Sequence, residues 1–208
     1  MSLTTSRCVG VTLADRCTAI REYVQADDLR PWGHRVPAAR GETPADSVAA
    51  WMRYQFTTRT LSYIADPDHC DLWGRPSATF FRGGGDCDDL SIVVAAALDV
   101  IDVPWVIVVG LWRGGGHAWV EGTDTAGGFL IETTAIRGNI YRGRRPVDYN
   151  RQQLLSRNCC SEAPEYVKSK KQAVQASRQV YAQRGLPWLP PNAQSHGYEP
   201  LFPWQPRY

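Results

Sequence analysis

Residues 82–98 read RGGGDCDDLSIVVAAAL, and this stretch organises the rest of the chain. The glycines permit a tight turn, and Asp86 can cap a helix because its carboxylate accepts backbone N–H groups of the first turn. Asp89, three residues later, can return the capping bond. The apolar run from Leu90 to Leu98 is too continuous for a surface helix and predicts a buried one. Cys87 therefore lies in the first turn of a buried helix, beside a glycine-rich gap.

Two effects act on the Cys87 thiol in opposite directions. The positive end of the helix dipole favours the thiolate, whereas the carboxylates of Asp86, Asp88 and Asp89 disfavour it. The balance depends on a cationic partner, and His117 is the candidate.

His117 follows a second Arg-Gly-Gly-Gly run, residues 113–116, and opens HAWVE, which has the pattern of a strand. A third apolar run, residues 129–131, ends in Glu132. A cysteine at a helix start, a histidine opening a strand and a carboxylate closing the next strand have the order of a nucleophile, a base and a group that orients the base.

The sequences GDCDDLS and HAWVE together resemble the transglutaminase-like superfamily, and most closely its bacterial cysteine proteinases, whose core is papain-like. The resemblance covers residues 54–136. It implies Cys87 as the nucleophile, His117 as the base and Glu132 as the third member of the triad. The family usually has Asp at that third place, in an Asp-Pro-Thr-like sequence, whereas the Glu of this chain is one methylene longer. Asp124 is the alternative third member.

The resemblance implies acyl transfer on peptide or amide bonds through a thioester. Hydrolysis is favoured over transfer to an amine, because the chain is short and lacks the extra domains usual in the cross-linking relatives. The oxyanion would meet the backbone N–H of Cys87 and a second donor, for which Gln55 and Trp73 are weak candidates. Two alternatives stay open: an inactive relative that only binds, and an interaction protein whose C-terminal tail is the working part.

Composition restricts the partners. The chain has 208 residues, 43% of them hydrophobic, which fits one domain with a sizeable core. A formal net charge of +2 gives no reason to expect nucleic acid or membranes as partners, and no apolar run is long enough to span a bilayer. No secretory signal opens the sequence, so we expect a cytoplasmic protein that acts on a peptide or protein substrate. The oligomeric state stays open.

Six cysteines and several acids bear on metals and disulfides. No Cys-x-x-Cys pair occurs, so we expect no zinc, and the cysteine density is too low for a disulfide scaffold. If Cys87 is the nucleophile, the odd remainder argues against full pairing; of the adjacent Cys159 and Cys160, we expect one to be buried and the other not. Some relatives with an Asp-Cys-Glu-Asp sequence depend on calcium. We nevertheless expect no cofactor, since three consecutive acids around a cysteine cannot all converge and capping accounts for two.

The pattern along the chain predicts an α+β fold with a papain-like or transglutaminase-like core. The nucleophile helix packs on an antiparallel sheet of at least three strands, and helices are added at both ends. A domain over residues 1–185 precedes an arm over residues 186–208, rich in proline and aromatic residues, which we expect to wrap the surface; partner binding is the alternative. The expected elements are helices over residues 13–28, 44–60 and 161–185, a loop over 30–42, strands over 106–112, 117–120 and 129–132 with a hairpin turn at 123–128, and an edge strand with Tyr141 and Val147.

Overall fold

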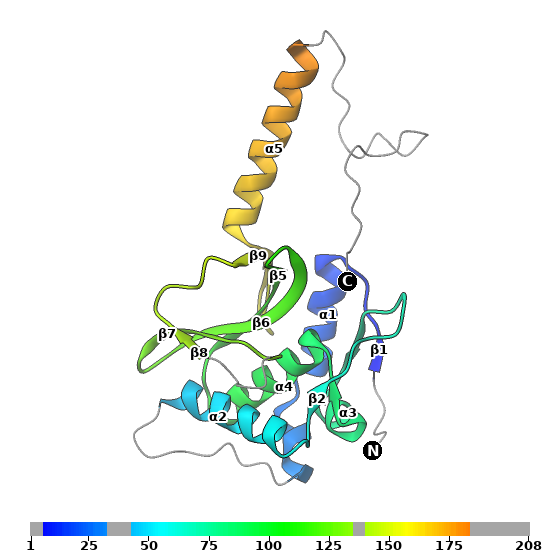
Figure 1. Ribbon diagram of the computed structural model, residues 1–208, viewed down its shortest axis with the longest axis vertical. Helices are drawn as coiled ribbons and strands as arrows, with labels where there is room; N and C mark the ends of the chain where they lie inside the picture. The colour runs from blue at the N-terminus through cyan, green and yellow to red at the C-terminus, as the bar shows by residue number, and fades with distance from the viewer. Residues whose placement is uncertain (1–5, 33–42, 135–139, 184–208) are drawn as a thin grey trace. The chain divides into compact units, whose positions relative to one another are not determined.

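The computed structural model describes residues 6–32, 43–134 and 140–183 (Figure 1). The chain divides into two units, Met1–Ala163 and Pro164–Tyr208, and the second contains helix α5. In chain order the elements are β1 Ser6–Cys8, α1 Leu13–Tyr23, the 3-10 helix η1 Ala26–Trp32, α2 Pro44–Thr57, β2 Ser62–Tyr63, β3 Leu72–Gly74, α3 Pro76–Arg82, β4 Gly84–Gly85, α4 Cys87–Val100, β5 Trp105–Trp112, β6 Gly115–Asp124, β7 Gly127–Ile131, β8 Ile140–Arg142, β9 Tyr149–Leu155, β10 Cys160–Glu162 and α5 Pro164–Gln183.

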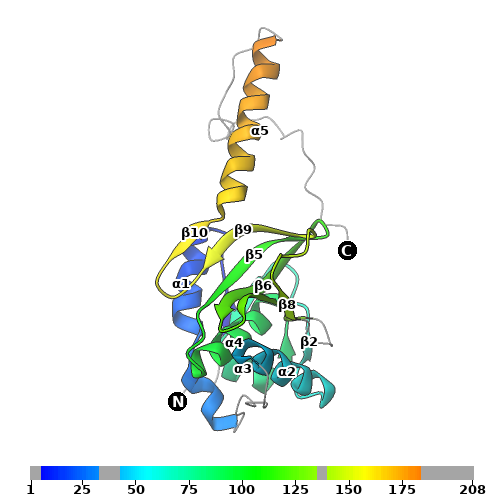
Figure 2. The same cartoon turned by 90° about the vertical axis from the view of Figure 1, so that its left-hand side faces the viewer.

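Helix α4 is the centre of the first unit. Every residue from Asp88 to Leu98 is buried, as the continuous apolar run predicted. The helix lies between the sheet and the pair α2 and α3, so apolar side chains meet it from both sides (Figures 1 and 2). Burial on all sides is what distinguishes such a helix from an amphipathic surface helix.

The main sheet has six strands in the order β10-β9-β5-β6-β7-β8, all antiparallel. Alternate residues face opposite sides of a strand, so the sheet buries two sets of side chains. The set that joins the α4 core includes Ile107, Val120 and Ile131. The set on the other face forms a second cluster of Val108, Trp119, Leu130 and Tyr149.

The helix starts follow local chemistry. The hydroxyls of Thr12 and Thr43 accept the backbone N–H of Asp15 and Asp46, at 3.2 and 3.3 Å, and the Asp86 carboxylate accepts that of Asp88 at 3.2 Å. Such bonds satisfy N–H groups that have no acceptor within the helix. The three predicted starts are therefore confirmed.

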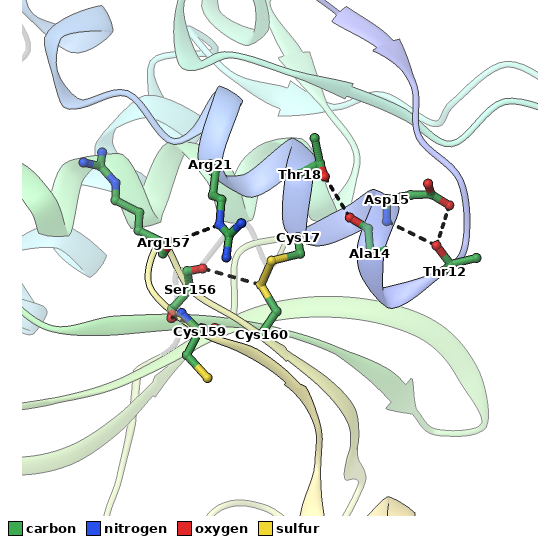
Figure 3. The surroundings of a disulfide bond; sticks show 10 residues. All are labelled: Thr12, Ala14, Asp15, Cys17, Thr18, Arg21, Ser156, Arg157, Cys159 and Cys160. Carbon is green, nitrogen blue, oxygen red and sulfur yellow. Dashed lines mark hydrogen bonds between the residues drawn. A yellow bond between two sulfur atoms is a disulfide. The ribbon is translucent and has the colours of Figure 1, made fainter.

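Two disulfides join distant parts of the first unit: Cys8 to Cys70, and Cys17 of α1 to Cys160 of β10 (Figure 3). Cys87 and Cys159 are the free cysteines of the described residues. Of the five cysteines other than Cys87, four form these disulfides and Cys159 is left over, as the odd number predicted. Cys159 is exposed, and its neighbour Cys160 is partly buried. Figure 3 shows Cys160 pointing toward Cys17 of α1, whereas the side chain of Cys159, which precedes β10, points away from it.

Several predicted boundaries need correction. The first helix ends at Tyr23, before the predicted end at residue 28, because Val24 has an extended conformation. The chain then forms the 3-10 helix η1 over Ala26–Trp32. The second helix ends at Thr57, and the chain reverses at Arg59, which has a φ of 57°. Tyr141 lies in β8 as expected, but Val147 lies outside any strand and is 89% exposed.

Other predicted elements agree with the structure or fall outside the residues that it describes. The hairpin between β6 and β7 is confirmed, and α5 falls within the helix predicted for residues 161–185. Strands β9 and β10 were not predicted. Most of the predicted loop over residues 30–42 and the whole of the arm over residues 186–208 lie outside the described residues. Within the described ranges, every helix is too short or too polar to cross a bilayer.

Candidate active site

Cys87 is the first residue of α4, at the end of the glycine-rich approach. Strand β4, Gly84–Gly85, pairs in parallel with β2 just before the cysteine. A Cβ at Gly85 would lie 2.3 Å from an Asp89 carboxylate oxygen, so this position needs glycine. Close packing of backbone against the first turn of α4 therefore fixes where the thiol lies.

The sulfur of Cys87 lies beside β6, where the backbone N–H of Ala118 donates toward it. Ala118 directly follows His117, so the cysteine meets the strand next to the predicted base. Strand β7 ends at Ile131, opposite Val120, so β7 does not pair with this part of β6.

The thiol of Cys87 is not acidic in this arrangement. Burial and then the Asp86 carboxylate raise its pKa to about 12, against the lowering effect of the Ala118 N–H. The sequence left open whether the helix dipole or the acids would prevail. Burial and the acids prevail, so the resting cysteine is a neutral thiol at neutral pH.

His117 and Glu132 form a buried pair. The Nε2 atom of His117 lies 3.1 and 3.0 Å from the two carboxylate oxygens of Glu132, and both side chains are less than a tenth exposed. Glu132 directly follows Ile131, which pairs with Val120, and so lies beside the middle of the neighbouring strand β6. The structure therefore brings together the histidine and the glutamate that the sequence singled out.

The Glu132 carboxylate has further donors that the sequence did not reveal. Thr134 donates to it twice, from its backbone N–H at 2.9 Å and its hydroxyl at 2.7 Å, and the hydroxyl of Tyr149 donates at 2.7 Å. Burial alone would raise the pKa of Glu132, but the bond and charge of His117, with the Thr134 and Tyr149 donors, lower it to about 2. The carboxylate is therefore charged throughout the physiological range.

Aromatic rings enclose the pair. The ring centroids of Trp112 and Trp119 lie 5.3 and 6.1 Å from that of His117, and Tyr149 lies 5.1 Å from Trp119. Alternation along β6 would have indicated that His117 and Trp119 share a face. No sequence signal pointed to Tyr149, which is distant in sequence and opens an unpredicted strand.

A second set of bonds ties the start of α4 to the segment after β7. The Ser91 hydroxyl donates to the Cys87 carbonyl at 2.6 Å and lies 3.2 Å from the Thr133 hydroxyl, which also donates to that carbonyl at 3.4 Å. Thr133 directly follows Glu132. Cysteine and glutamate, which belong to different elements, are thus held in one framework.

The alternative third member, Asp124, lies elsewhere. Its carboxylate binds Arg142 at 2.7 Å and the backbone N–H of Ala45 at 3.1 Å, and Arg142 lowers its pKa strongly. It closes the far end of β6, whereas Glu132 is within hydrogen-bond distance of His117. The geometry therefore favours Glu132 as the partner of the imidazole.

The two candidates for the second oxyanion donor differ. The indole N–H of Trp73 donates to Asp71 at 2.7 Å, which argues against Trp73 as the donor. Gln55 is 1% exposed, and its Oε1 atom has no hydrogen-bond partner among the described residues. Nothing here tests its role, which stays a prediction.

The acids around Cys87 gather into one cluster with two more from the preceding loop. Oxygens of Asp66, Asp86 and Asp89 lie within 4.8 Å of one another, and so do those of Asp66, Asp71 and Asp88. Asp89 does not return the capping bond: it accepts from the Gly74 N–H at 2.8 Å and pairs with Arg82 at 2.5 Å. None of the groups found among the described residues holds Asp86, Asp88 and Asp89 together, so the expectation that these three acids would not all converge is not contradicted. Asp66 and Asp71, which the sequence did not single out, supply the further oxygens.

The cluster is electrostatically costly as it stands. Burial is the largest cause that raises the pKa of Asp66 to about 6 and that of Asp89 to about 7, and it raises the pKa of Asp86 and Asp88 as well. The Oδ1 atom of Asp88 is buried and has no hydrogen-bond partner among the described residues. An unpartnered buried carboxylate oxygen among other acids fits the donor set of a hard cation such as calcium.

Comparisons with known proteins give weak likenesses. No protein-family model and no curated protein matches the chain. Among solved structures, it is similar to LapG of Legionella pneumophila in a calcium-bound form (TM-score 0.47, 15% identity, 74% of this chain and 88% of that one) and in an EGTA-treated form (0.46, 17%, 74% and 87%). It is also similar to a candidate cysteine protease from Cytophaga hutchinsonii (0.45, 15%, 62% and 47%). Scores of this size describe a partial likeness of chain path and carry no conclusion about activity.

Proposed function

We propose that this chain is a cysteine-dependent hydrolase of peptide or amide bonds, of the transglutaminase-like type, with Cys87, His117 and Glu132 as its triad. The observation that carries the proposal is the buried His117–Glu132 pair, with a free cysteine at a helix start beside the next residue of the same strand. This arrangement supplies a nucleophile, a base and a group that holds the base.

In the proposed first half-reaction, His117 acts as the general base. Its Nε2 is engaged by Glu132, which leaves Nδ1 to accept the proton of the Cys87 thiol. Because the resting thiol is neutral, proton transfer accompanies attack: sulfur bonds to the carbonyl carbon, and the negative charge develops on the carbonyl oxygen. The backbone N–H of Cys87, in the first turn of α4 where no helix carbonyl accepts it, is the first donor to that oxygen.

Collapse of the intermediate breaks the carbon–nitrogen bond. Imidazolium His117 gives its proton to the leaving amine, and Glu132 stabilises the charged ring until it does so. Water, deprotonated by His117, then cleaves the thioester and restores the thiol. An amine in place of water would give the transglutaminase outcome from the same acyl-enzyme.

Mass spectrometry of a peptide library incubated with the protein and putrescine tests the reaction class. We expect cleaved peptides, a peptidyl adduct on Cys87, and loss of both in Cys87→Ala and His117→Ala. The matched control is Cys159→Ser, which removes the exposed free thiol and should leave both in place. Putrescine-modified peptides would favour the transferase, whereas no product from the unsubstituted protein, or product that survives Cys87→Ala, would refute the enzyme proposal.

We further propose that the acidic cluster holds a calcium ion, with Asp66, Asp71, Asp86 and Asp88 as ligands. The fit rests on the oxygens of Asp66, Asp71 and Asp88, which lie within 4.8 Å of one another, and on the unpartnered Oδ1 of Asp88. Asp86 joins Asp66 and Asp88 in the two neighbouring groups of the same kind. A bound cation would neutralise the carboxylates that raise the pKa of the neighbouring thiol.

Thermal unfolding with calcium or with EGTA tests this site. Calcium should raise the melting temperature, and more so at pH 8 than at pH 5, because the carboxylates with raised pKa bind protons at the lower pH. Asp88→Asn should remove the shift, and Asp27→Asn, at an exposed pair with Arg30, should keep it. An equal calcium shift in Asp88→Asn would contradict the assignment.

Two disulfides also bear on where the protein works. Cys8–Cys70 and Cys17–Cys160 are of the kind that forms in oxidising compartments and is rare in the cytosol of mesophiles. This favours an oxidising compartment over the cytoplasmic location expected from the sequence. Thiol counting on protein purified without reductant tests it: two free thiols are expected, and six would contradict it.

A further inference from the structure

We infer that Tyr149 is a positioning residue for the proposed reaction: its hydroxyl holds the Glu132 carboxylate in the orientation that fixes His117. The inference rests on the proposed function of the His117–Glu132 pair. It adds a residue that neither the motifs nor the resemblance indicated.

The contact is direct and buried. The Tyr149 hydroxyl donates to Oε2 of Glu132 at 2.7 Å, and the same oxygen lies 3.0 Å from Nε2 of His117. The other oxygen, Oε1, accepts from the backbone and hydroxyl of Thr134. Each carboxylate oxygen therefore has a donor besides His117, and the plane of the carboxylate is fixed on both sides. Tyr149 and Glu132 are each 4% exposed, so water does not compete freely for these bonds.

A glutamate needs such an anchor more than an aspartate does. Its additional methylene adds a rotatable bond, so the carboxylate can turn away from the imidazole unless something outside its own segment holds it. Thr134 lies two residues from Glu132 and moves with the same segment. Tyr149 comes from a different strand and ties the carboxylate to the sheet.

That sheet also carries His117. Strand β5 pairs with β9 at Trp112–Tyr149 and with β6 at Gly110–His117, so the anchor and the base are both fixed to β5. Tyr149 is itself held, since its ring lies 5.1 Å from that of Trp119 and 6.1 Å from that of Trp112. Burial and the adjacent Glu132 raise the pKa of the Tyr149 phenol far above its ordinary value, so the hydroxyl remains a neutral donor.

A double-mutant cycle tests the role. We expect Tyr149→Phe to lower kcat about tenfold, the size of a lost hydrogen bond to a charged group, with KM changed less than twofold. In the Glu132→Gln background the same substitution should have no further effect, because Tyr149 acts through the glutamate. Tyr23→Phe, at a tyrosine that is 1% exposed in α1, is the control for losing a buried hydroxyl and should leave kcat unchanged.

The second readout needs no activity. The NMR signals of the His117 ring, assigned by their loss in His117→Ala, should move in Tyr149→Phe, because Glu132 no longer holds the ring in the same orientation, and should not move when Tyr149→Phe is added to Glu132→Gln. Unmoved ring signals, or losses of kcat that add in the double variant, would overturn the positioning role. If the unsubstituted protein cleaves nothing but the ring signals still move only while Glu132 is present, the positioning contact stands and the hydrolase proposal fails.

Discussion

Replacing Glu132 by Gln gives the sharpest test of the buried pair, because the structure sets the size of the effect. The pKa of Glu132 falls from its ordinary value of 4.5 to about 2 on folding. This fall in pKa is worth roughly 3 kcal/mol, at about 1.36 kcal/mol for each pKa unit, and the side chain is buried enough that solvent screening does not reduce it.

The sign of the effect fixes the pH window. A carboxyl whose pKa is depressed on folding stabilises the protein above its unfolded pKa, and the stabilisation is lost as the pH falls through the folded pKa. The difference in unfolding free energy between the unsubstituted protein and Glu132→Gln should therefore be larger at pH 6 than at pH 2, by about 3 kcal/mol. Most of that loss falls between about pH 4.5 and pH 2. The acidic cluster titrates in both proteins, so its contribution cancels in the difference.

Urea denaturation with the disulfides intact, at pH 6, 4, 3 and 2, measures that difference. The control is Glu22→Gln, which removes a half-exposed partner of Arg7 and should change the unfolding free energy by less than about 1 kcal/mol at every pH. A gap between Glu132→Gln and the unsubstituted protein that stays constant from pH 6 to pH 2 would refute the electrostatic account of the pair.

Two further predictions concern the start of α4. In a Cys159→Ser background, alkylation of Cys87 by iodoacetamide should become about tenfold faster per pH unit from pH 7 to pH 10, because the thiol has a pKa of about 12; a plateau by pH 8 would show a thiolate already formed. Gly85→Ala should lower the unfolding free energy by about 1–3 kcal/mol, because its Cβ would lie 2.3 Å from the Asp89 carboxylate. Gly116→Ala, where nothing lies within 4 Å of the added Cβ, should change it by less than about 0.5 kcal/mol in thermal or urea melts, and equal losses would contradict the packing argument.

Local signals account for what the sequence predicted correctly. The caps at Thr12, Thr43 and Asp86 depend on side chains that bond within a turn, and the buried α4 depends on a continuous apolar run. The meeting of His117 with Glu132 required only that two consecutive strands form a hairpin. Each of these inferences uses residues that are neighbours along the chain or across one turn.

What the sequence did not reveal depends on contacts between distant segments. Strand β9 reads YNRQQLL and lacks the β-branched and alternating pattern of a strand, yet it brings Tyr149 to Glu132. Asp66 seemed to mark only a turn, but the loop that holds it folds back on α4 and completes the acidic cluster. Cysteine pairing across 62 and 143 residues likewise follows from the tertiary fold and not from spacing.

The position of Asp86 explains why the site combines a buried thiol with so many acids. Its carboxylate caps α4 and so helps to place Cys87, yet the same charge raises the pKa of the thiol that it places. Substituting Asp86 to make the cysteine more acidic would therefore weaken the helix start, at a cost of about 1 kcal/mol, which is typical for a lost cap. A base that removes the proton during attack avoids this conflict, and so does a cation that neutralises Asp86 without removing it. In the proposed mechanism His117 would supply the first solution and a cation in the acidic cluster the second, so the proposed chemistry does not require a thiolate at rest.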